Sequence, residues 1–421
     1  MKPRILVIGH GHPDLIAGGA ERAAYSLFKT LKAAGEYEPV FVARATPPDL
    51  GHSGAFATFR GRPDEILWAP PVYDHFRVTS LGHDAFREHV SELAARFRPR
   101  IVHAHHYMFM GIEMFRHFRE FAGSRNVLTL HEYKLICHND GQMVKTQTLK
   151  PCYESSPAEC HACFPHLASG KFFLRNQMAR EYLAAVDAFV STSHFCTDRH
   201  ANWGIPREKI TTMENIILAD PPLADSAEAG RGARVRFGYF GQLNPYKGAH
   251  VLLDAVKLLS EEHQEKCEIV IFGANLEFQS EAFQADLRAR MAESPIKVSF
   301  YGRYRNEDVA RLMRDVDWMV IPSIWWENSP LVIQEARVAG TPILCSNIGG
   351  MAEKVEDGVT GAHFLVGSPA HLAEKIAAIV DGRIHVPRRP LDIGRQNADI
   401  AARHMALYRD LLAKEPAAAL A

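Results

Sequence analysis

Two glutamates separated by seven residues, Glu327 and Glu335, lie in a segment with proline at 330 and glycine at 340. Pro330 suits the first turn of a helix, and Gly340 suits the left-handed residue that ends one. The start of such a helix has free N–H groups and the positive end of the helix dipole, which can bind a phosphate. Glu335 can then accept hydrogen bonds from a ribose and Glu327 from a second polyol. The alternative is that both acids only complement the dipole.

Three residues at the start of this helix would form its ligand-binding end. Asn328 or Ser329 can cap the helix with a side-chain oxygen. The amide of Leu331 would then be among the N–H groups that face a phosphate. The segment therefore favours a nucleotide at one end and a sugar at the other.

Lys247 is the cation best placed to act with these acids. It follows a predicted strand and a tight Asn-Pro turn, is succeeded by Gly248, and stands just ahead of a helix. A lysine in that position can stabilise the charge of a departing phosphate. The alternative is a solvated surface lysine.

The first half of the chain supplies glycines and histidines at predicted strand ends. Gly18 and Gly19 precede a helix, so backbone N–H groups can approach a phosphate there, although a simple tight turn competes as an interpretation. His131 follows another strand, and 16 of the 22 histidines lie before residue 219. A lone histidine is more often structural, but this concentration favours a polar cleft. The glycines near Gly9 do not complete Gly-x-Gly-x-x-Gly, which disfavours a dinucleotide cofactor.

Short apolar strands alternate with amphipathic helices in both halves of the chain, as is typical of parallel sheets covered on both faces. We therefore predict an α/β fold of two Rossmann-like, doubly wound domains that face a central cleft. The strands are predicted at 4–9, 40–43, 101–105, 127–130 and 188–191, and then at 236–240, 268–272, 298–301, 319–322 and 342–345.

The domain boundary is predicted where small, polar, proline and glycine residues accumulate. An acceptor-side domain would span 1–218, a linker 219–233 and a donor-nucleotide domain 234–395. A C-terminal helix at 396–414 would pack back toward the first domain, followed by a tail at 415–421.

These motifs resemble those of glycosyltransferase family 4. The segment around Glu327 and Glu335, the stretch 240–248, and the later Gly349-Gly350 and Gly358-Val-Thr-Gly361 look like its donor half. Gly18-Gly19-Ala-Glu-Arg, Ile101-Val-His-Ala-His105 and Leu130-His131-Glu132 look like its acceptor half. That family has the GT-B fold and retains anomeric configuration. The resemblance extends over nearly the whole chain.

The resemblance implies roles for single residues. Glu335 would bind the donor ribose, Glu327 would lie at the transferred sugar and its phosphate, and Lys247 would pair with the diphosphate. His131 would contact the donor sugar near the scissile bond, so His131, Glu327 and Lys247 are the candidate catalytic residues. The family is usually assigned same-face attack, with the departing phosphate assisting the acceptor proton. Double displacement is the alternative, but no carboxylate nucleophile is evident.

One departure from the family pattern concerns the diphosphate. The family commonly has arginine where this chain has Gln242, and a neutral amide removes one of two expected positive charges. Arg303, directly after a predicted strand, is the candidate replacement. A solvated arginine at a strand end is the competing interpretation.

Four of the seven cysteines, Cys137, Cys152, Cys160 and Cys163, are crowded into an irregular stretch. Four thiolates can bind one Zn²⁺ tetrahedrally and hold such a stretch in place. Only the last pair has a familiar spacing, and free buried thiols are the alternative.

Composition excludes several classes of protein. The 421 residues are 47% hydrophobic and 23% charged with a net charge of -1, which favours compact domains over a disordered or nucleic-acid-binding chain. No apolar run is long enough to cross a bilayer. We expect a cytoplasmic protein, with contact at the inner face of the membrane if its substrate is lipid-linked.

The predicted function is retaining transfer of a sugar from a nucleotide-diphosphate sugar to a glycan or glycolipid acceptor. Catalysis is expected to need no cofactor beyond this donor and no divalent metal, with structural zinc as the one metal considered. The partners are the nucleotide sugar and a glycan or lipid-linked acceptor, not nucleic acid. A GT-B nucleotide-sugar epimerase and a non-catalytic nucleotide-sugar-binding protein are the alternatives.

Overall fold

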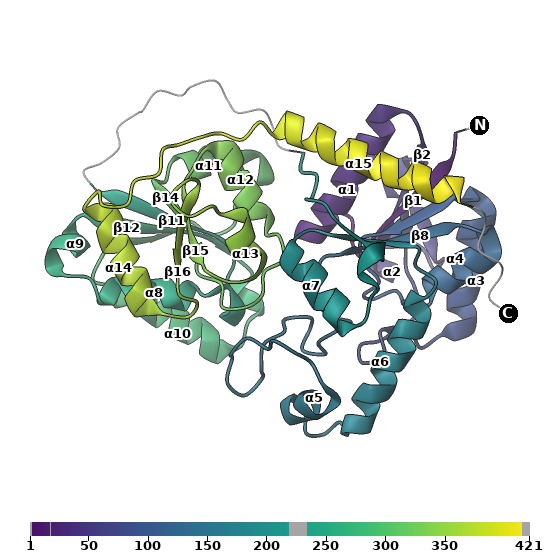
Figure 1. Cartoon of the computed structure of the whole chain (residues 1–421), viewed down its shortest axis with the longest axis horizontal. Coiled ribbons are helices and arrows are strands. Elements are labelled where there is room, and N and C mark those ends of the chain that lie inside the picture. The colour runs from purple at the N-terminus through teal and green to yellow at the C-terminus, as the bar shows by residue number, and fades with distance from the viewer. Residues whose placement is uncertain (1, 17, 219–233, 415–421) are drawn as a thin grey trace. The chain divides into compact units, whose positions relative to one another are not determined.

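The computed structural model describes residues 2–16, 18–218 and 234–414 and divides the chain into two compact units. Unit 1 comprises residues 1–217 and those from Gly394 onward, and unit 2 comprises Leu218–Ile393. The predicted linker 219–233 and tail 415–421 lie outside the described residues. Figure 1 shows the helices and strands of each unit.

Unit 1 is built on an eight-stranded sheet in the order β10-β9-β8-β7-β1-β2-β4-β3. All neighbouring pairs are parallel except β3 with β4. A separate antiparallel pair joins β5 to β6. The strands are β1 (Arg4–Gly9), β2 (Glu38–Arg44), β3 (Phe56–Thr58), β4 (Glu65–Trp68), β5 (Tyr73–Asp74), β6 (Thr79–Ser80), β7 (Ile101–Ala104), β8 (Arg125–Leu130), β9 (Ala188–Ser191) and β10 (Ile210–Thr212).

The long helices that cover this sheet bury apolar side chains against it, as α1 (Gly19–Ala34) shows. In the first helix, Ala24, Leu27, Phe28 and Leu31 are buried at helical spacing, and Gly35 ends it in the left-handed conformation. The helices are α1 (Gly19–Ala34), α2 (Pro47–Leu50), α3 (His83–Phe97), α4 (Met114–Ala122), α5 (Pro157–Cys163), α6 (Ser169–Leu183), α7 (His194–Trp203) and α15 (Ile393–Ala413).

The last helix, α15, belongs to the core of unit 1. Its Ile400, Tyr408 and Leu411 are buried in the same hydrophobic cluster as Val7 of β1 and Phe28 of α1. Tyr408 also hydrogen-bonds to a buried histidine, because its Oη lies 2.6 Å from Nδ1 of His103. A segment far along the chain therefore completes the first unit (Figure 1).

Unit 2 has a six-stranded, wholly parallel sheet in the order β13-β12-β11-β14-β15-β16. Its strands are β11 (Val235–Gln242), β12 (Cys267–Ala274), β13 (Val298–Phe300), β14 (Trp318–Ile321), β15 (Ile343–Ser346) and β16 (Gly361–Phe364). Its helices are α8 (Ala249–Lys257), α9 (Glu261–Glu265), α10 (Glu281–Ala292), α11 (Val309–Arg314), α12 (Leu331–Ala339), α13 (Gly349–Lys354) and α14 (Pro369–Val380).

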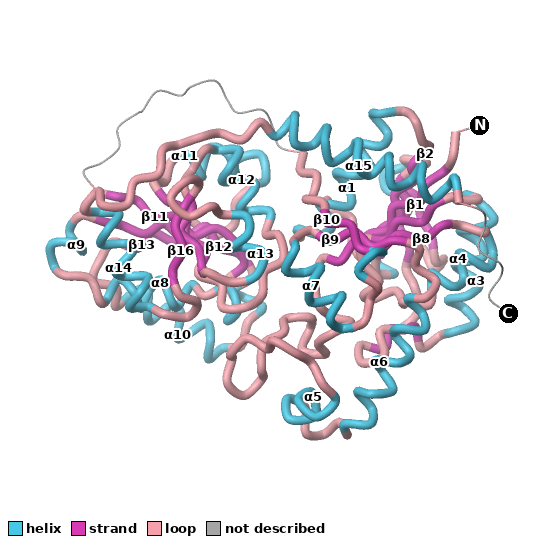
Figure 2. The backbone as a smooth tube through the Cα atoms, viewed as in Figure 1, coloured by secondary structure: helices cyan, strands magenta, loops and turns pink. Residues whose placement is uncertain are grey.

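Both sheets lie among helices (Figure 2), which confirms the predicted class of α/β fold with Rossmann-like domains. In a parallel sheet the carboxyl ends of the strands gather at one edge, where ligands of such folds bind. None of the described helices is both long and apolar enough to cross a membrane.

Candidate active site

Lys247 is positioned by a tight turn directly after β11. The Oδ1 atom of Asn244 accepts hydrogen bonds from the backbone N–H groups of Tyr246 and Lys247 at 3.0 and 3.1 Å. Gly248 then has a φ of 72°, and a Cβ atom there would lie 1.8 Å from the carbonyl oxygen of Pro322. Only glycine therefore allows this turn to pack against the end of β14.

The side chain of Lys247 reaches Glu327 in the loop between β14 and α12. Its Nζ lies 2.5 Å from Oε1 of Glu327. The same oxygen accepts hydrogen bonds from Ser323 Oγ at 2.9 Å and from Trp325 Nε1 at 2.8 Å. Glu327 is only 4% exposed. Three donors thus fix one carboxylate oxygen beside a lysine whose side chain remains 25% exposed.

Two glycines hold the backbone around Glu327. The N–H of Gly350 donates to the carbonyl oxygen of Glu327 at 2.8 Å. A Cβ atom on Gly350 would lie 1.5 Å from the carbonyl oxygen of Asn328, and Gly349 has a φ of 57°. The start of α13 therefore lies against the loop that carries Glu327 and Asn328.

The helix that follows, α12, starts without a side-chain cap. We expected Asn328 or Ser329 to cap it, but Pro330 occupies the N-cap position and no side chain there accepts a hydrogen bond from the first turn. This expectation was wrong because a proline at the cap has no side-chain acceptor. Leu331 therefore begins a helix of nine residues whose N-cap residue makes no side-chain cap hydrogen bond. Glu335 lies in its second turn and is 6% exposed.

Gln242 and Arg303 lie at two other strand ends of unit 2. Gln242 is exposed at the end of β11, with its Oε1 3.5 Å from Asn244 Nδ2. Arg303 is 62% exposed along its side chain, forms an ion pair with Glu277, and lies 3.3 Å from Asn275 Oδ1. Arg303 thus has a carboxylate partner of its own, which competes with any role as the second cation for a diphosphate.

His131, in unit 1, follows β8 and pairs with a second histidine. Nδ1 of His105 lies 2.9 Å from Nε2 of His131. Burial lowers the pKa of His131 to about 3 and places the pKa of His105 well below its ordinary value, so both rings are neutral at pH 7. One ring therefore donates and the other accepts.

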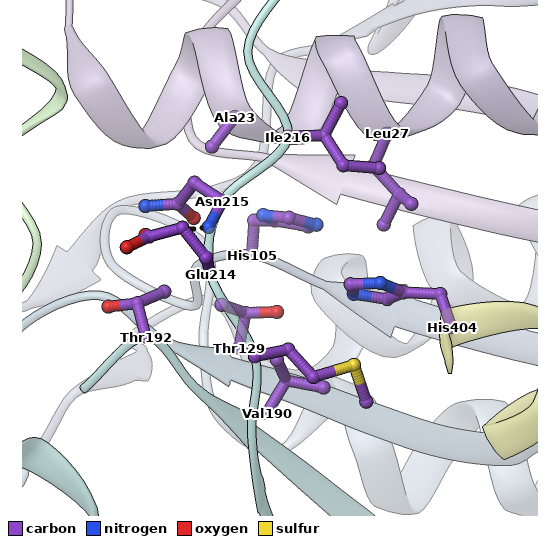
Figure 3. Close-up of a pocket in the computed structure, with 11 residues that line it drawn as sticks. Ala23, Leu27, His105, Thr129, Val190, Thr192, Glu214, Asn215, Ile216 and His404 are labelled. Atoms are coloured by element: carbon purple, nitrogen blue, oxygen red, sulfur yellow. Dashed lines mark hydrogen bonds between the residues drawn. The ribbon is translucent and has the colours of Figure 1, made fainter. Parts of the chain in front are cut away.

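A small cavity lies next to His105 and is also lined by His404 of α15. Figure 3 shows the rings of His105 and His404 pointing into it, with Thr129 and Asn215 also in its lining. The Nε2 atom of His105 is buried and has no hydrogen-bond partner. This cavity is therefore lined by two neutral histidines together with Thr129, Asn215 and the carboxyl group of Glu214.

The glycine pair at the start of α1 faces a carboxylate. Gly18 is the N-cap and Gly19 the first helical residue. A Cβ atom on Gly18 would lie 2.1 Å from Oε2 of Glu21, so the glycine makes room for that side chain. Glu21 is 4% exposed, and its Oε1 lies 3.0 Å from Nε2 of His10. A carboxylate thus occupies the space beside Gly18 where the sequence suggested a phosphate.

Sequence reasoning missed the carboxyl group of Glu132, which is partly buried in unit 1. Burial raises the pKa of Glu132 to about 7, although Tyr107 Oη donates to its Oε1 at 3.0 Å and the N–H of Lys134 donates to its Oε2. Burial likewise raises the pKa of Glu113 to about 7. Groups that titrate near pH 7 are candidates for proton transfer. The motif Leu130-His131-Glu132 is the feature of the sequence that could have identified Glu132.

The predicted zinc site at the four clustered cysteines stays a prediction. All are free thiols. No three histidine, cysteine, aspartate or glutamate side chains within the described ranges form a group that could hold a metal ion. Burial raises the pKa of Cys137 to about 12 and that of Cys160 to about 11, so without a metal ion these groups are thiols.

Comparison with known proteins gives two family matches that follow one another along the chain. Residues 17–219 match the model described as Glycosyltransferase Family 4, and residues 227–397 match Glycosyl transferases group 1. The glycogen synthase of Mycobacterium tuberculosis is 26% identical over 404 residues, which cover 92% of this chain and 88% of that protein.

Solved structures share the fold over almost the whole chain. The sucrose-phosphate synthase of Thermosynechococcus elongatus is 20% identical, with a TM-score of 0.70 and coverage of 98% of this chain and 100% of that one. Anabaena HepE in complex with UDP and glucose is 19% identical, with a TM-score of 0.62 and coverage of 97% and 95%. Together with the two consecutive family matches, these findings show that the chain belongs to glycosyltransferase family 4 and has the GT-B fold.

Proposed function

We propose that this glycosyltransferase moves a sugar, with retention of anomeric configuration, from a nucleotide-diphosphate sugar to a glycan or glycolipid acceptor. The proposal rests on the ion pair between Lys247 and Glu327 at the strand ends of unit 2. Glycines that pack tightly against neighbouring backbone, at 248, 349 and 350, hold both residues in place. A cation and a fixed carboxylate beside a helix start suit a diphosphate and a polyol.

In unit 2, Lys247 is proposed to bind the diphosphate, aided by the amide of Leu331 and its neighbours at the start of α12. Glu335 is proposed to accept hydrogen bonds from the ribose. Glu327, with three donors on one oxygen, keeps its Oε2 for the hydroxyls of the transferred sugar. Gln242, Asn328 and Ser329 remain proposed donor contacts, and Arg303 could contribute only by leaving Glu277.

The proposed step is same-face substitution. The bond between the anomeric carbon and the phosphate oxygen breaks, the acceptor oxygen bonds to that carbon on the same face, and the acceptor proton passes to the departing phosphate. Lys247 stabilises the charge that develops on the phosphate, an effect worth about 100- to 1000-fold in rate when one such group is removed.

Unit 1 is proposed to bind the acceptor, and His131 is the candidate contact with the transferred sugar. Its neutral ring, held by His105, can donate or accept a hydrogen bond without adding a second cation. Support for a nucleotide donor comes from the solved relative that was crystallised with UDP and glucose. Support for a glycan acceptor comes from the glycogen synthase relative.

The test is incubation of the full chain with radiolabelled UDP-, ADP- and GDP-sugars, together with thermal unfolding in UDP, ADP and GDP. We expect one nucleoside diphosphate to raise the melting temperature, because a ligand of the folded state stabilises it. We also expect slow donor hydrolysis or transfer, with the product anomer retained by NMR. Binding without turnover would favour the non-catalytic alternative.

The ribose assignment has a test of its own. Glu335→Ala should raise the KM for the donor about tenfold with little change in kcat, because the ribose contact is made equally before and during reaction. Glu353→Ala, in α13 of the same unit, is the matched control. Unchanged donor affinity in Glu335→Ala would overturn the assignment.

A further inference from the structure

Three buried polar atoms without hydrogen-bond partners belong to residues that surround one aromatic ring in unit 1. They are His10 Nδ1, Arg44 Nε and Tyr73 Oη. The ring of Phe109 lies 5.2 Å from the guanidinium carbon of Arg44, 5.9 Å from the ring of Tyr73 and 6.4 Å from that of His10. Buried polar groups in folded proteins are nearly always paired with protein or ordered water, so three unpaired atoms around one ring leave hydrogen-bonding capacity that a ligand can use.

These residues share one edge of the sheet. His10 directly follows β1, Arg44 ends β2, and Phe109 lies in the loop after β7. Because β2 and β7 are the two parallel neighbours of β1, their carboxyl ends are adjacent. This is the edge at which parallel α/β sheets bind ligands.

Arg44 has a positive charge that no nearby carboxylate neutralises by contact. Among residues with described positions, none forms an ion pair with its guanidinium, and burial lowers the pKa of Arg44. The carboxylate of Asp49 accepts hydrogen bonds from the N–H and Oγ1 of Thr46, both at 2.6 Å. Glu21 is paired with His10. Asp49 therefore acts on Arg44 through its charge and not through an ion pair.

Phe109 is held in a costly conformation. Its φ of 61° is in the left-handed region, which a bulky residue rarely adopts. The ring also meets His75 edge-on at 5.4 Å. Such strain persists where the surrounding structure imposes it, and it is frequent at ligand-binding sites. The half-buried ring presents a flat apolar surface beside the guanidinium.

We propose that the acceptor of the sugar transfer carries an anionic group, phosphate or carboxylate, which binds the Arg44 guanidinium while its sugar ring packs against Phe109. This inference rests on the proposed function and specifies the substrate class of unit 1. Tyr73 Oη and His10 Nδ1 supply further hydrogen bonds to the acceptor. A planar guanidinium suits either anion because its paired N–H groups match two oxygens.

The experiment measures binding of glucose 6-phosphate, glucuronate and glucose to the full chain by titration calorimetry, in the presence of saturating UDP. Wild type should bind at least one of the anionic sugars about tenfold or more tightly than glucose. Preference for glucose 6-phosphate identifies a phosphate, and preference for glucuronate identifies a carboxylate. Equal affinity for all three sugars, or no binding of either anionic sugar, overturns the proposal.

Variants separate the guanidinium from general charge. Arg44→Gln should weaken binding of the preferred anionic sugar about 10- to 100-fold, the loss expected for a charge-assisted hydrogen-bonded pair. Tyr73→Phe, which removes only a hydroxyl, should weaken it by a few-fold and serves if Arg44→Gln does not fold. Arg60→Gln is the matched control, because Arg60 is 63% exposed and already paired with Asp14. Affinity in Arg44→Gln equal to wild type also overturns the proposal.

These results are distinguishable from a failure of the proposed function. If wild type binds UDP and transfers sugar but does not discriminate between charged and neutral sugars, only the acceptor inference fails. If no nucleoside diphosphate binds and no donor is hydrolysed, the proposed function fails with it.

Discussion

The two units present different chemistry at equivalent edges of their parallel sheets. In unit 1 these positions carry neutral histidines such as His105 and His131, and carboxyl groups such as Glu132 whose pKa is near 7. In unit 2 they carry Lys247 and Glu327, which form an ion pair between two loops that closely packed glycines hold in place. The same topology thus offers one edge that combines neutral imidazoles with the cation Arg44, and one edge where a lysine and a carboxylate are paired.

The two units differ in how burial and pairing set the charge of their polar side chains. Unit 1 holds the histidines His105, His131 and His404 in the neutral form, because desolvation is the largest cause of the lowered pKa of each. Unit 2 keeps its charges by pairing them and by supplying hydrogen-bond donors to Glu327. The following predictions test that division.

The largest effect is expected from Lys247→Ala. If unit 2 supplies the charge for the departing phosphate, kcat should fall about 100- to 1000-fold while the KM for the donor changes far less. Steady-state kinetics with the donor identified above provide the measurement. Lys257→Ala, at an exposed lysine paired with Glu293, should leave both constants unchanged. A pure KM effect in Lys247→Ala would contradict the proposed role.

The next largest effect is expected at Gly248, one of the glycines that pack against the loop of Lys247 and Glu327. Gly248→Ala places a Cβ atom 1.8 Å from Pro322, so it should destabilise unit 2 by roughly 3 kcal/mol or more and displace Lys247. Gly358→Ala is the matched control, because its φ of 76° is similar but no atom lies within 4 Å of the added carbon. It should cost only about 1 kcal/mol. Equal losses in chemical denaturation would mean that backbone conformation alone matters.

Acid should destabilise unit 1 before unit 2. The pKa of His131 is about 3 and that of His404 about 4 in the folded chain, both lowered by burial from 6.5. Between pH 6.5 and the pKa of the folded state, the unfolded state binds more protons than the folded state. The free energy of unfolding is therefore highest above pH 6.5 and falls as pH decreases toward 4. Each such histidine contributes about 1.4 kcal/mol per pH unit.

Two carboxyl groups oppose this trend. The pKa values of Glu113 and Glu132 are about 7, so their burial destabilises the fold above pH 7 and this penalty is relieved as pH falls toward 4.5. The buried histidines His103, His105 and His106 add to the first effect and outweigh the two acids. Calorimetric unfolding between pH 7.5 and 5.0, with a nucleoside diphosphate to mark the unit 2 transition, should show the unit 1 transition falling more steeply. If the unfolding temperatures of both units fell equally with pH, the proposed electrostatic difference between the units would be contradicted.

The smallest effect is expected from Tyr408→Phe in α15. Removal of its hydroxyl leaves Nδ1 of the buried His103 without a partner and should cost about 1 to 2 kcal/mol of unit 1 stability. Donor binding by unit 2 should not change. Denaturant unfolding and a UDP titration measure the two outcomes, and a large loss of UDP affinity would contradict the assignment of α15 to unit 1 alone.

Strand patterns and a few motifs predicted most of the fold. Apolar runs located β1, β7, β8, β11 and β14, because each is buried on both faces of a parallel sheet. The pattern missed β3 and β4, since an antiparallel edge strand of three residues and its short neighbour have too little apolar periodicity to detect.

The site was predicted in part. Spacing and turn residues singled out Lys247 and Glu327, but not Ser323 and Trp325, because those contacts depend on how the loop after β14 folds over the carboxylate. The sequence likewise could not show that Arg303 has Glu277 as its partner, since the two residues lie on separate loops. The zinc site stays a prediction: the four clustered cysteines lie close enough to shift one another's pKa, although no metal-holding group is found among the described residues.

The discontinuity of unit 1 has a consequence during synthesis on the ribosome. All strands and helices of unit 2 have been made before α15 emerges, whereas the core of unit 1 still lacks Tyr408 and Leu411 at that moment. The nascent polypeptide would therefore complete its second half first, and the first half would hold an exposed apolar groove that awaits a chaperone or its own final helix.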